Sequence, residues 1–255
     1  MKYIIQFLTR YIPRPYLLKF SLFFSKFVSL FYFGNNFFCP CCKGHFRKFL
    51  PYGRIKARYN ALCPGCLSLE RHRLLWLYLE NQTNFFSDKL RTLHFAPEQC
   101  FLSKFKAMKN LEYITADIES PLAMVKMDIT NMHFENNSFD VILCNHLLEH
   151  VEDDRKAIRE MYRVLRKGGW AIIQPHIDNN RETTFEDPSI TSPEERERLF
   201  NQRDHVRVYG QDYKNRLEEA GFVVCVEKYI KEIEEGELKR LSLPADEDIY
   251  MCKKI

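Results

Sequence analysis

Hydrophobic and polar positions between residues 139 and 174 predict a strand, a helix and a second strand. The run from Phe139 to Cys144 is apolar and follows a polar turn, which is typical of a buried strand. After a polar loop, apolar residues recur at helical spacing at Ala157, Ile158, Met161, Val164 and Leu165. Gly168 and Gly169 are expected to end this helix, and Trp170 to Gln174 predicts the next strand. This order predicts a βαβ unit of a parallel sheet, with a ligand at the carboxyl ends of its strands.

Similar patterns predict further elements on both sides of this unit. Further strands are expected at residues 90–96, 111–118, 124–129, 222–226 and 248–252, and helices at residues 74–80 and 212–220. The polar connector at residues 81–89 is the expected domain boundary. The polar segment from Asp178 to Asp204 contains Pro188 and Pro193 and is expected to form a lid over a substrate. The chain is therefore expected to be an α/β protein with one large core and a small accessory module.

Charge is distributed unevenly along the chain. Residues 1–75 contain 13 Lys and Arg but one acidic residue, Glu70, whereas the rest of the chain contains 25 Lys and Arg and 33 Asp and Glu. A basic amino-terminal third predicts an anionic partner, which the sequence leaves open as a membrane surface, a nucleic acid or a phosphorylated carrier.

The first 38 residues predict basic amphipathic helices that are divided by Pro13 and Pro15. A helix from Tyr16 to Phe33 places these side chains on one face: Phe20, Phe23, Phe24, Phe27, Leu30 and Phe31. Lysines interrupt the segment, so it lacks the run of about 20 uncharged apolar residues that is needed to span a bilayer. It also shows no signal-peptide cleavage site. Such a helix is suited to the interface of an anionic membrane. Packing of its apolar face on the rest of the chain, or binding to nucleic acid, is the alternative.

Four cysteines predict a metal centre. Cys39 and Cys42 form one C-x2-C pair, and Cys63 and Cys66 form a second pair twenty residues later. Two such pairs supply the four thiolates of a structural zinc site. Reduced thiols without a metal are the alternative, and the sequence leaves open whether Cys41 or His45 replaces one ligand. Basic residues interleaved with aromatic residues lie between the pairs and are suited to phosphates, bases or sugars, or to a solvated surface.

The sequence FDVILCNHLLEHVED, followed by RVLRKGG, resembles class I S-adenosylmethionine-dependent methyltransferases, over roughly residues 90 to 255. The resemblance implies a Rossmann-like fold, with a mostly parallel seven-stranded sheet whose last strand is antiparallel. It also implies S-adenosylmethionine as the cofactor. We therefore predict three parts: basic amphipathic helices at residues 1–38, a zinc-ribbon-like module at residues 39–75 and a methyltransferase domain at residues 76–255.

The resemblance also implies a set of cofactor-binding residues. These are Phe95, Ala96, Pro97, Glu98, Asp117, Ile118, Asp128, Ile129 and Asn145. In the family, the acid at the end of the second strand binds the ribose, which implies this role for Asp117, and the position of Asp128 faces the adenine amino group. The loop after the first strand lacks the glycines usual in the family. This departure argues against a dinucleotide, because a pyrophosphate needs close approach to the backbone.

His146 and His150 lie in the loop after the fourth predicted strand and are the candidate catalytic residues. An alcohol acceptor needs a general base, and a histidine titrates near neutral pH. The alternative is that His150 caps the following helix and His146 shapes the pocket. His176, His205 and Arg207 are further candidates.

These features together predict a methyltransferase that is cytoplasmic and peripheral on the inner face of the membrane. Its expected acceptor is a saccharide, a lipid-linked glycan or another small molecule. One alternative is an rRNA or tRNA methyltransferase whose zinc module binds RNA. The other is a degenerate scaffold without catalytic activity.

Overall fold

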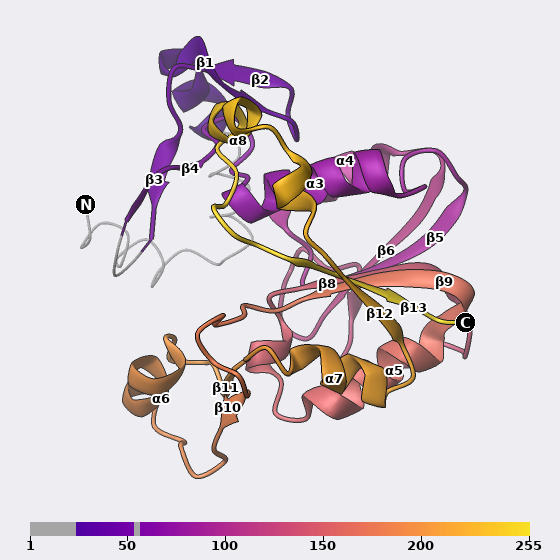
Figure 1. Ribbon diagram of the computed structural model, residues 1–255. Coiled ribbons are helices and arrows are strands. Elements are labelled where there is room, and N and C mark those ends of the chain that lie inside the picture. Colours follow the sequence, from indigo (N-terminus) through magenta and orange to yellow (C-terminus); the bar gives the residue numbers. More distant parts are fainter. Residues whose placement is uncertain (1–23, 54–56) are drawn as a thin grey trace. The chain divides into compact units, whose positions relative to one another are not determined.

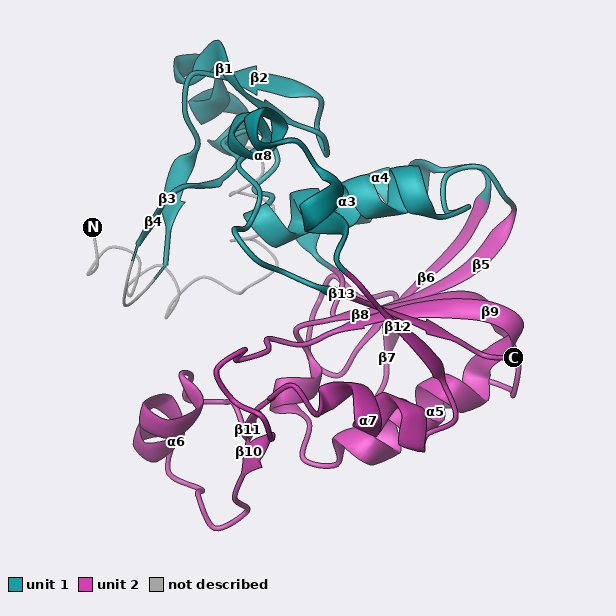
Figure 2. Cartoon of the chain, viewed as in Figure 1, with its two compact units in different colours: residues 1–88, 98–110, 228–248 teal, residues 89–97, 111–227, 249–255 magenta. Residues whose placement is uncertain are grey.

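The computed structural model describes residues 24–53 and 57–255 (Figure 1). These residues cluster into two compact units (Figure 2). The first unit comprises Met1–Asp88, Glu98–Asn110 and Lys228–Asp248, and the second comprises Lys89–Pro97, Leu111–Glu227 and Ile249–Ile255. The two units group residues by their contacts and not by their position along the chain. They therefore do not test the predicted boundaries after residues 38 and 75, which remain predictions.

The second unit contains a seven-stranded sheet. Its strands, in spatial order, are β7 (Val125–Lys126), β6 (Leu111–Asp117), β5 (Leu90–Phe95), β8 (Phe139–Asn145), β9 (Leu165–Gln174), β13 (Ile249–Lys253) and β12 (Val223–Glu227). β5 to β9 pair in parallel, and β13 is antiparallel to both of its neighbours. Helices α5 (Asp154–Val164) and α7 (Tyr213–Glu219) lie on one face of this sheet (Figure 2). The predicted Rossmann-like fold is therefore confirmed.

Burial of the central strands explains why this sheet forms. Six of the seven β8 residues are buried, as expected for a parallel strand covered on both faces. Helix α5 begins after Asp153, whose side chain accepts a hydrogen bond from the backbone N–H of Lys156. Ala157, Ile158 and Met161 then face the core of this unit, at the spacing that the sequence predicted.

Gly168 and Gly169 do not end the helix, so this prediction was wrong. Helix α5 ends at Val164, and both glycines lie inside β9. Gly168 has a φ of 76°, and a Cβ atom on Gly169 would lie 2.8 Å from the carbonyl oxygen of Asp140. The pairing of β8 with β9 shifts register beside them, between Phe139 and Val141. The glycine pair therefore permits an irregularity in the sheet.

The predicted lid segment contains its own small elements. A hairpin of β10 (Phe185–Glu186) and β11 (Arg207–Val208) encloses α6 (Pro193–Phe200), which begins after the N-cap residue Ser192. None of these three elements was predicted from the hydrophobic pattern. They are short, so a periodic pattern has too few residues to appear.

Ion pairs and hydrogen bonds attach this hairpin to α5 and α7. Arg207 is buried and donates to the carbonyl oxygens of Leu148, Val151 and Glu152. Glu186 accepts hydrogen bonds from Arg207 at 2.8 Å and from Arg216 at 2.7 Å. The buried carboxylate of Asp154 pairs with Arg216 at 3.0 Å and accepts a 2.6 Å hydrogen bond from the Tyr209 hydroxyl. Removing one partner of such a network leaves a buried charge unpaired.

This network predicts acid sensitivity. Burial opposes ionisation of Glu186, but Arg216 and Arg207 outweigh it and lower its pKa from 4.5 to about 2. A carboxyl group whose pKa falls on folding stabilises the protein above its unfolded pKa and loses that contribution as pH falls towards the folded value. We therefore expect the free energy of unfolding to fall between pH 4.5 and 2, and to fall less in Glu186→Gln. Urea unfolding at pH 5 and pH 3 measures this; equal pH dependence in both proteins would contradict it.

The first unit combines helices with two small sheets. Its strands are β1 (Phe33–Cys39), β2 (Gly44–Phe46), β3 (Leu50–Tyr52) and β4 (Arg58–Leu62), paired β1 with β2 and β3 with β4. Its helices are α3 (Glu70–Gln82), α4 (Gln99–Ala107) and α8 (Glu235–Leu241), with a 3-10 turn, η2 (Tyr229–Glu232). An aromatic cluster joins α3 to α4, in which Trp76 stacks on Phe105 at 5.8 Å between ring centroids.

Arg73 holds the small sheets of this unit to α8. Its side chain is fully buried and donates hydrogen bonds to the carbonyl oxygens of Leu241, Ala61 and Ser68. Its guanidinium carbon also lies 4.6 Å from the ring centroid of Phe49. This arginine of the basic amino-terminal third is therefore structural and unavailable to an anionic partner.

The described part of the amino-terminal helix covers residues 24–31. Pro13, Pro15, Phe20 and Phe23, which belong to the predicted amphipathic segment, lie outside the described residues. The side chain of Ser25 is buried, with its Oγ 3.5 Å from the Gly65 carbonyl oxygen. Four apolar residues of the predicted face are 52 to 71% exposed: Phe24, Phe27, Leu30 and Phe31. No helix among the described residues is long and apolar enough to cross a membrane.

Candidate active site and metal centre

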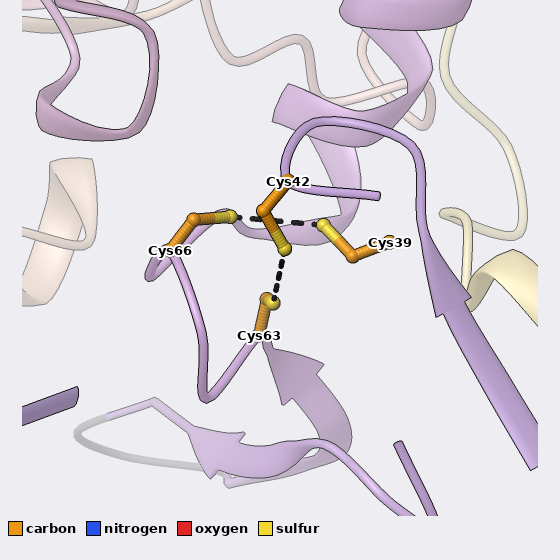
Figure 3. Close-up of side chains that lie close together, drawn as sticks. All are labelled: Cys39, Cys42, Cys63 and Cys66. Carbon is orange, nitrogen blue, oxygen red and sulfur yellow. Dashed lines mark hydrogen bonds between the residues drawn. The ribbon is translucent and has the colours of Figure 1, made fainter. Parts of the chain in front are cut away.

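The four predicted metal ligands converge on one point (Figure 3). The Sγ atoms of Cys39 and Cys66 lie 3.6 Å apart, those of Cys42 and Cys63 lie 3.7 Å apart, and all four lie within 4.8 Å of one another. Sulfurs about 2.3 Å from one zinc ion in a tetrahedron stand about 3.8 Å apart. The thiols therefore fit a tetrahedral zinc ion.

The two alternative ligands lie outside this cluster. Cys41 is buried with its Sγ 3.7 Å from the carbonyl oxygen of His72, and the His45 ring packs on Phe38 at 4.9 Å between centroids. The hydroxyl of Ser68 instead lies 3.3 Å from the sulfurs of both Cys39 and Cys66. A hydroxyl in this place can donate a hydrogen bond to a thiolate ligand and orient it.

The loop after β5 makes its turn without glycine. Ala96 has a φ of 45°, and its N–H donates a 3.0 Å hydrogen bond to the carbonyl oxygen of Ala116. The left-handed region costs a residue with a Cβ about 1–2 kcal/mol, and the following Pro97 restricts this backbone further. Strain of this kind persists where the surroundings fix it, often at functional sites. The adjoining Phe95 is buried in the core of the second unit, whereas Glu98 is the N-cap residue of α4 in the first unit.

Of the two predicted nucleoside-binding acids, Asp117 is the last residue of β6 and Asp128 lies in the turn after β7. Asp117 Oδ1 accepts hydrogen bonds from the backbone N–H groups of Glu119 and Ser120, at 2.7 and 2.6 Å. Asp128 Oδ1 accepts from the backbone N–H and the hydroxyl of Thr130. Each carboxylate therefore uses one oxygen to hold its own turn and keeps a second oxygen for another partner. Of the neighbouring apolar candidates, Ile118 is 53% exposed and Ile129 is buried.

His146 and Glu149 form a pair at the carboxyl end of β8. His146 follows Asn145, the buried last residue of the strand, and has a φ of 49°. Its Nδ1 lies 3.5 Å from Oε1 of Glu149, whose side chain is 3% exposed and also accepts from the backbone N–H of His176. Burial opposes ionisation of Glu149, but His146 and nearby backbone N–H groups outweigh it and hold its pKa below the ordinary value. The buried carboxylate is therefore charged at neutral pH.

The geometry of this pair defines the tautomer of His146. An ionised carboxylate can only accept, so Nδ1 is the protonated nitrogen and Nε2 carries the lone pair. Nε2 is buried and has no hydrogen-bond partner among the described residues. An oriented imidazole with an available lone pair can accept a proton from a bound hydroxyl group.

Two other histidine candidates, His150 and His205, lie against each other. His150 belongs to the 3-10 turn η1 (Leu148–His150). Its Nδ1 lies 3.2 Å from Oδ2 of Asp204. The His205 ring is 4.6 Å from that of His150, between centroids. Arg207 supports the hairpin described above, and His176 contributes its backbone N–H to Glu149. Asp204 was not predicted as a site residue, because nothing in a linear pattern joins it to a histidine so far upstream.

The comparisons with known proteins agree with the fold. A family model described as a methyltransferase domain matches residues 90–173, which span β5 to β9. The ajmaline N-methyltransferase of Rauvolfia serpentina is 34% identical over 79 residues, which are 31% of this chain and 26% of that protein. The ubiquinone/menaquinone biosynthesis C-methyltransferase UbiE of Enterobacter sp. (strain 638) is 36% identical over 64 residues, which are 25% of this chain and 21% of that protein. The alignments with these two curated relatives thus span about a quarter of their length or less.

One solved structure shows the same fold over nearly the whole chain. The (4+2)-cyclase SpnF superposes with a TM-score of 0.53 at 13% sequence identity, covering 93% of this chain and 96% of that chain. SpnF is a cyclase by name, so the fold by itself does not determine the reaction. Residues 90–173 therefore match the methyltransferase-domain family, and the strand order with its antiparallel last strand is that of a Rossmann-like methyltransferase fold.

Proposed function

We propose that the protein transfers a methyl group from S-adenosylmethionine to an oxygen of a small-molecule acceptor. The observation that carries this proposal is the His146–Glu149 pair at the carboxyl end of β8, inside the matched domain. A saccharide or a lipid-linked glycan is the acceptor class that we favour, because it offers hydroxyl groups and suits a basic, aromatic amino-terminal third.

The chain's own residues supply positioning and a base. When bound, S-adenosylmethionine supplies a methyl group on a positively charged sulfur, open to in-line displacement. Nε2 of His146 would accept the hydroxyl proton of a bound acceptor, and Glu149 would stabilise the resulting imidazolium. Alignment of the acceptor by these residues would supply much of the acceleration. We assign the base to His146 because its partner Glu149 is buried, whereas Asp204, the partner of His150, is 70% exposed; a catalytic role for His150 stays a prediction.

The cofactor's predicted binding residues can be tested at Asp117. If its second oxygen accepts hydrogen bonds from a ribose, Asp117→Ala should weaken cofactor binding by about 1.5–3 kcal/mol, the range for hydrogen bonds to a charged group. Asp117→Asn keeps an acceptor for the turn and should also bind more weakly. Asp187→Ala is the matched control. Asp187 also accepts a hydrogen bond from the backbone N–H two residues later, that of Ser189, and it is not a predicted cofactor-binding residue. Calorimetry measures the affinities, and equal values for the Asp117 and Asp187 variants would exclude Asp117 from the site.

Direct measurements test the overall proposal. Calorimetry with S-adenosylmethionine and S-adenosylhomocysteine comes first, followed by a screen for transfer of a radiolabelled methyl group to cell fractions. We expect binding of both compounds and label in a small-molecule or glycolipid fraction. Label in RNA, with an RNA affinity that falls steeply with salt, would support the RNA methyltransferase instead. No binding of either compound would support the scaffold alternative.

We also propose that the Cys39, Cys42, Cys63 and Cys66 cluster holds a structural zinc ion. Its four buried or partly buried sulfurs stand at tetrahedral separations, as expected for a site closed to other ligands. The role that the geometry supports is to join the two loops that carry the C-x2-C pairs.

A peripheral position on the inner face of a membrane is the last part of the proposal. The polar side of the amino-terminal helix packs inward at Ser25 while its aromatic side remains exposed, the orientation an interfacial helix requires. Two basic residues, Arg47 and Lys48, lie within 5.8 Å of the Tyr32 ring centroid near the end of this helix. Basic residues close to an anionic surface contribute about 1 kcal/mol each.

Vesicle binding tests the exposed aromatic face. We expect Phe27→Ser and Phe31→Ser together to lower the affinity for anionic vesicles at least tenfold, since burying one such side chain contributes about 1.5–3 kcal/mol. Tyr59→Ser is the matched control, because this aromatic residue is 85% exposed elsewhere in the first unit. Co-sedimentation at low and high salt measures binding. Absence of vesicle binding by the wild-type protein would contradict the proposal.

A further inference from the structure

A second group of metal-ligating side chains lies away from the cysteine cluster. His150, Asp204 and His205 each offer one ligand atom, and these three atoms lie within 4.8 Å of one another. His150 belongs to η1, whereas Asp204 and His205 follow α6 in the inserted segment. The tertiary fold therefore brings together two parts of the second unit that are distant in sequence.

The hydrogen bonding of His205 prepares it as a ligand. Its side chain is 5% exposed, and its Nδ1 lies 3.0 Å from the carbonyl oxygen of Phe200. A carbonyl oxygen only accepts, so Nδ1 carries the proton and the lone pair belongs to Nε2. Metal-binding histidines usually engage their other nitrogen in such a hydrogen bond, which fixes the tautomer and the ring orientation.

The surrounding charges favour a cation. Asp204 and the buried Glu149 supply negative charge, and the positive Arg203 pairs with Glu194 and Glu197 of α6. The negative charge around the three side chains therefore favours a divalent cation.

We propose that His150, Asp204 and His205 bind a divalent ion of the zinc class. Two imidazole nitrogens and one carboxylate oxygen suit such borderline ions. Ligands about 2.0–2.1 Å from one ion stand about 3.3 Å apart in a tetrahedron, and His150 Nδ1 and Asp204 Oδ2 already stand 3.2 Å apart. The rings of His150 and His205 lie 4.6 Å apart between centroids, so all three side chains border the same point.

This site differs in kind from the cysteine cluster. Three protein ligands leave a fourth position for water or for an oxygen of a bound molecule, the arrangement of an open rather than a closed zinc site. The bound ion would also attach the inserted segment to η1, four residues after His146. Metal binding here does not depend on methyl transfer, so the two proposals can fail separately.

Zinc titration of the full-length protein tests the site. The protein is first loaded with one zinc per chain, and further zinc is then added in calorimetry at pH 7.5. We expect one additional binding event in the wild type. Asp204→Asn should raise the Kd of this event roughly 100-fold or more, beyond the 10–100-fold lost when a residue that only hydrogen-bonds to a metal ligand is removed. Asp204 has a 70% exposed side chain, so this variant removes a ligand with little risk to folding.

The controls separate this site from adventitious binding. His205→Ala should also abolish the additional event, whereas His133→Ala should keep it, because His133 is exposed and outside the cluster. The proposal is overturned if the wild type binds no zinc beyond the first, or if Asp204→Asn binds the second zinc as tightly as the wild type does.

Discussion

Cys63→Ser is expected to lose the zinc ion and to unfold the small sheets of the first unit. Cys63 follows β4, and its sulfur meets that of Cys42, which follows β1. Formation of such a site contributes about 10–16 kcal/mol in zinc-finger peptides, which is comparable with the whole stability of a domain. The small sheets have only two strands each, and two-stranded sheets are marginal without further support.

Metal analysis and thermal unfolding measure this effect. We expect about one zinc per chain in the wild type purified without added metal, a much lower value in Cys63→Ser, and an added low-temperature unfolding transition in the variant. Cys225→Ser is the matched control, because Cys225 is an exposed cysteine of β12 outside the cluster. Well under one zinc per wild-type chain, or equal zinc in Cys63→Ser, would contradict the assignment.

His146→Ala is expected to lower kcat by about 10²–10⁴-fold, the usual contribution of a general base. The Kd for S-adenosylmethionine should remain unchanged, since the proposed role is proton transfer from the acceptor. Glu149→Gln should lower kcat less, because the amide still accepts a hydrogen bond from Nδ1 of His146 but no longer stabilises the imidazolium by charge.

The pH profile separates catalysis from a structural role. The wild-type rate should depend on pH, and His146→Ala should lose this dependence while retaining its thermal stability. His133→Ala controls for removal of an exposed histidine. A variant of His146 that keeps the wild-type pH profile would remove this residue from the mechanism, whatever its rate.

Short-range patterns in the sequence were sufficient for the central fold. The strand that became β8 and the helix that became α5 are specified by apolar periodicity over a few residues, because burial of one face or of a whole strand imposes that period. The four-cysteine cluster could be predicted for a related reason: each C-x2-C pair lies within one tight turn. The antiparallel last strand came from the family resemblance, since periodicity carries no information on strand direction.

Contacts between residues that are distant in sequence were visible only in the tertiary structure. Arg73 belongs to a basic stretch, but its guanidinium is buried against the carbonyl oxygen of Leu241, 168 residues away. Asp154 pairs with Arg216, 62 residues later, and this pair helps to fix the inserted hairpin. Such contacts depend on which backbone atoms lie opposite one another after folding, and no local pattern encodes this.

The candidate site shows the same division. The sequence by itself determined that histidines follow β8, that an acid ends β6 and that another follows β7, because those residues adjoin strands that it predicted. Only the tertiary structure paired His146 with Glu149 and brought Asp204 and His205 to His150. The reason is geometric. The left-handed backbone at His146 and the 3-10 turn after it set the directions of the His146, Glu149 and His150 side chains. Asp204 and His205 come from the inserted segment, which is distant in sequence.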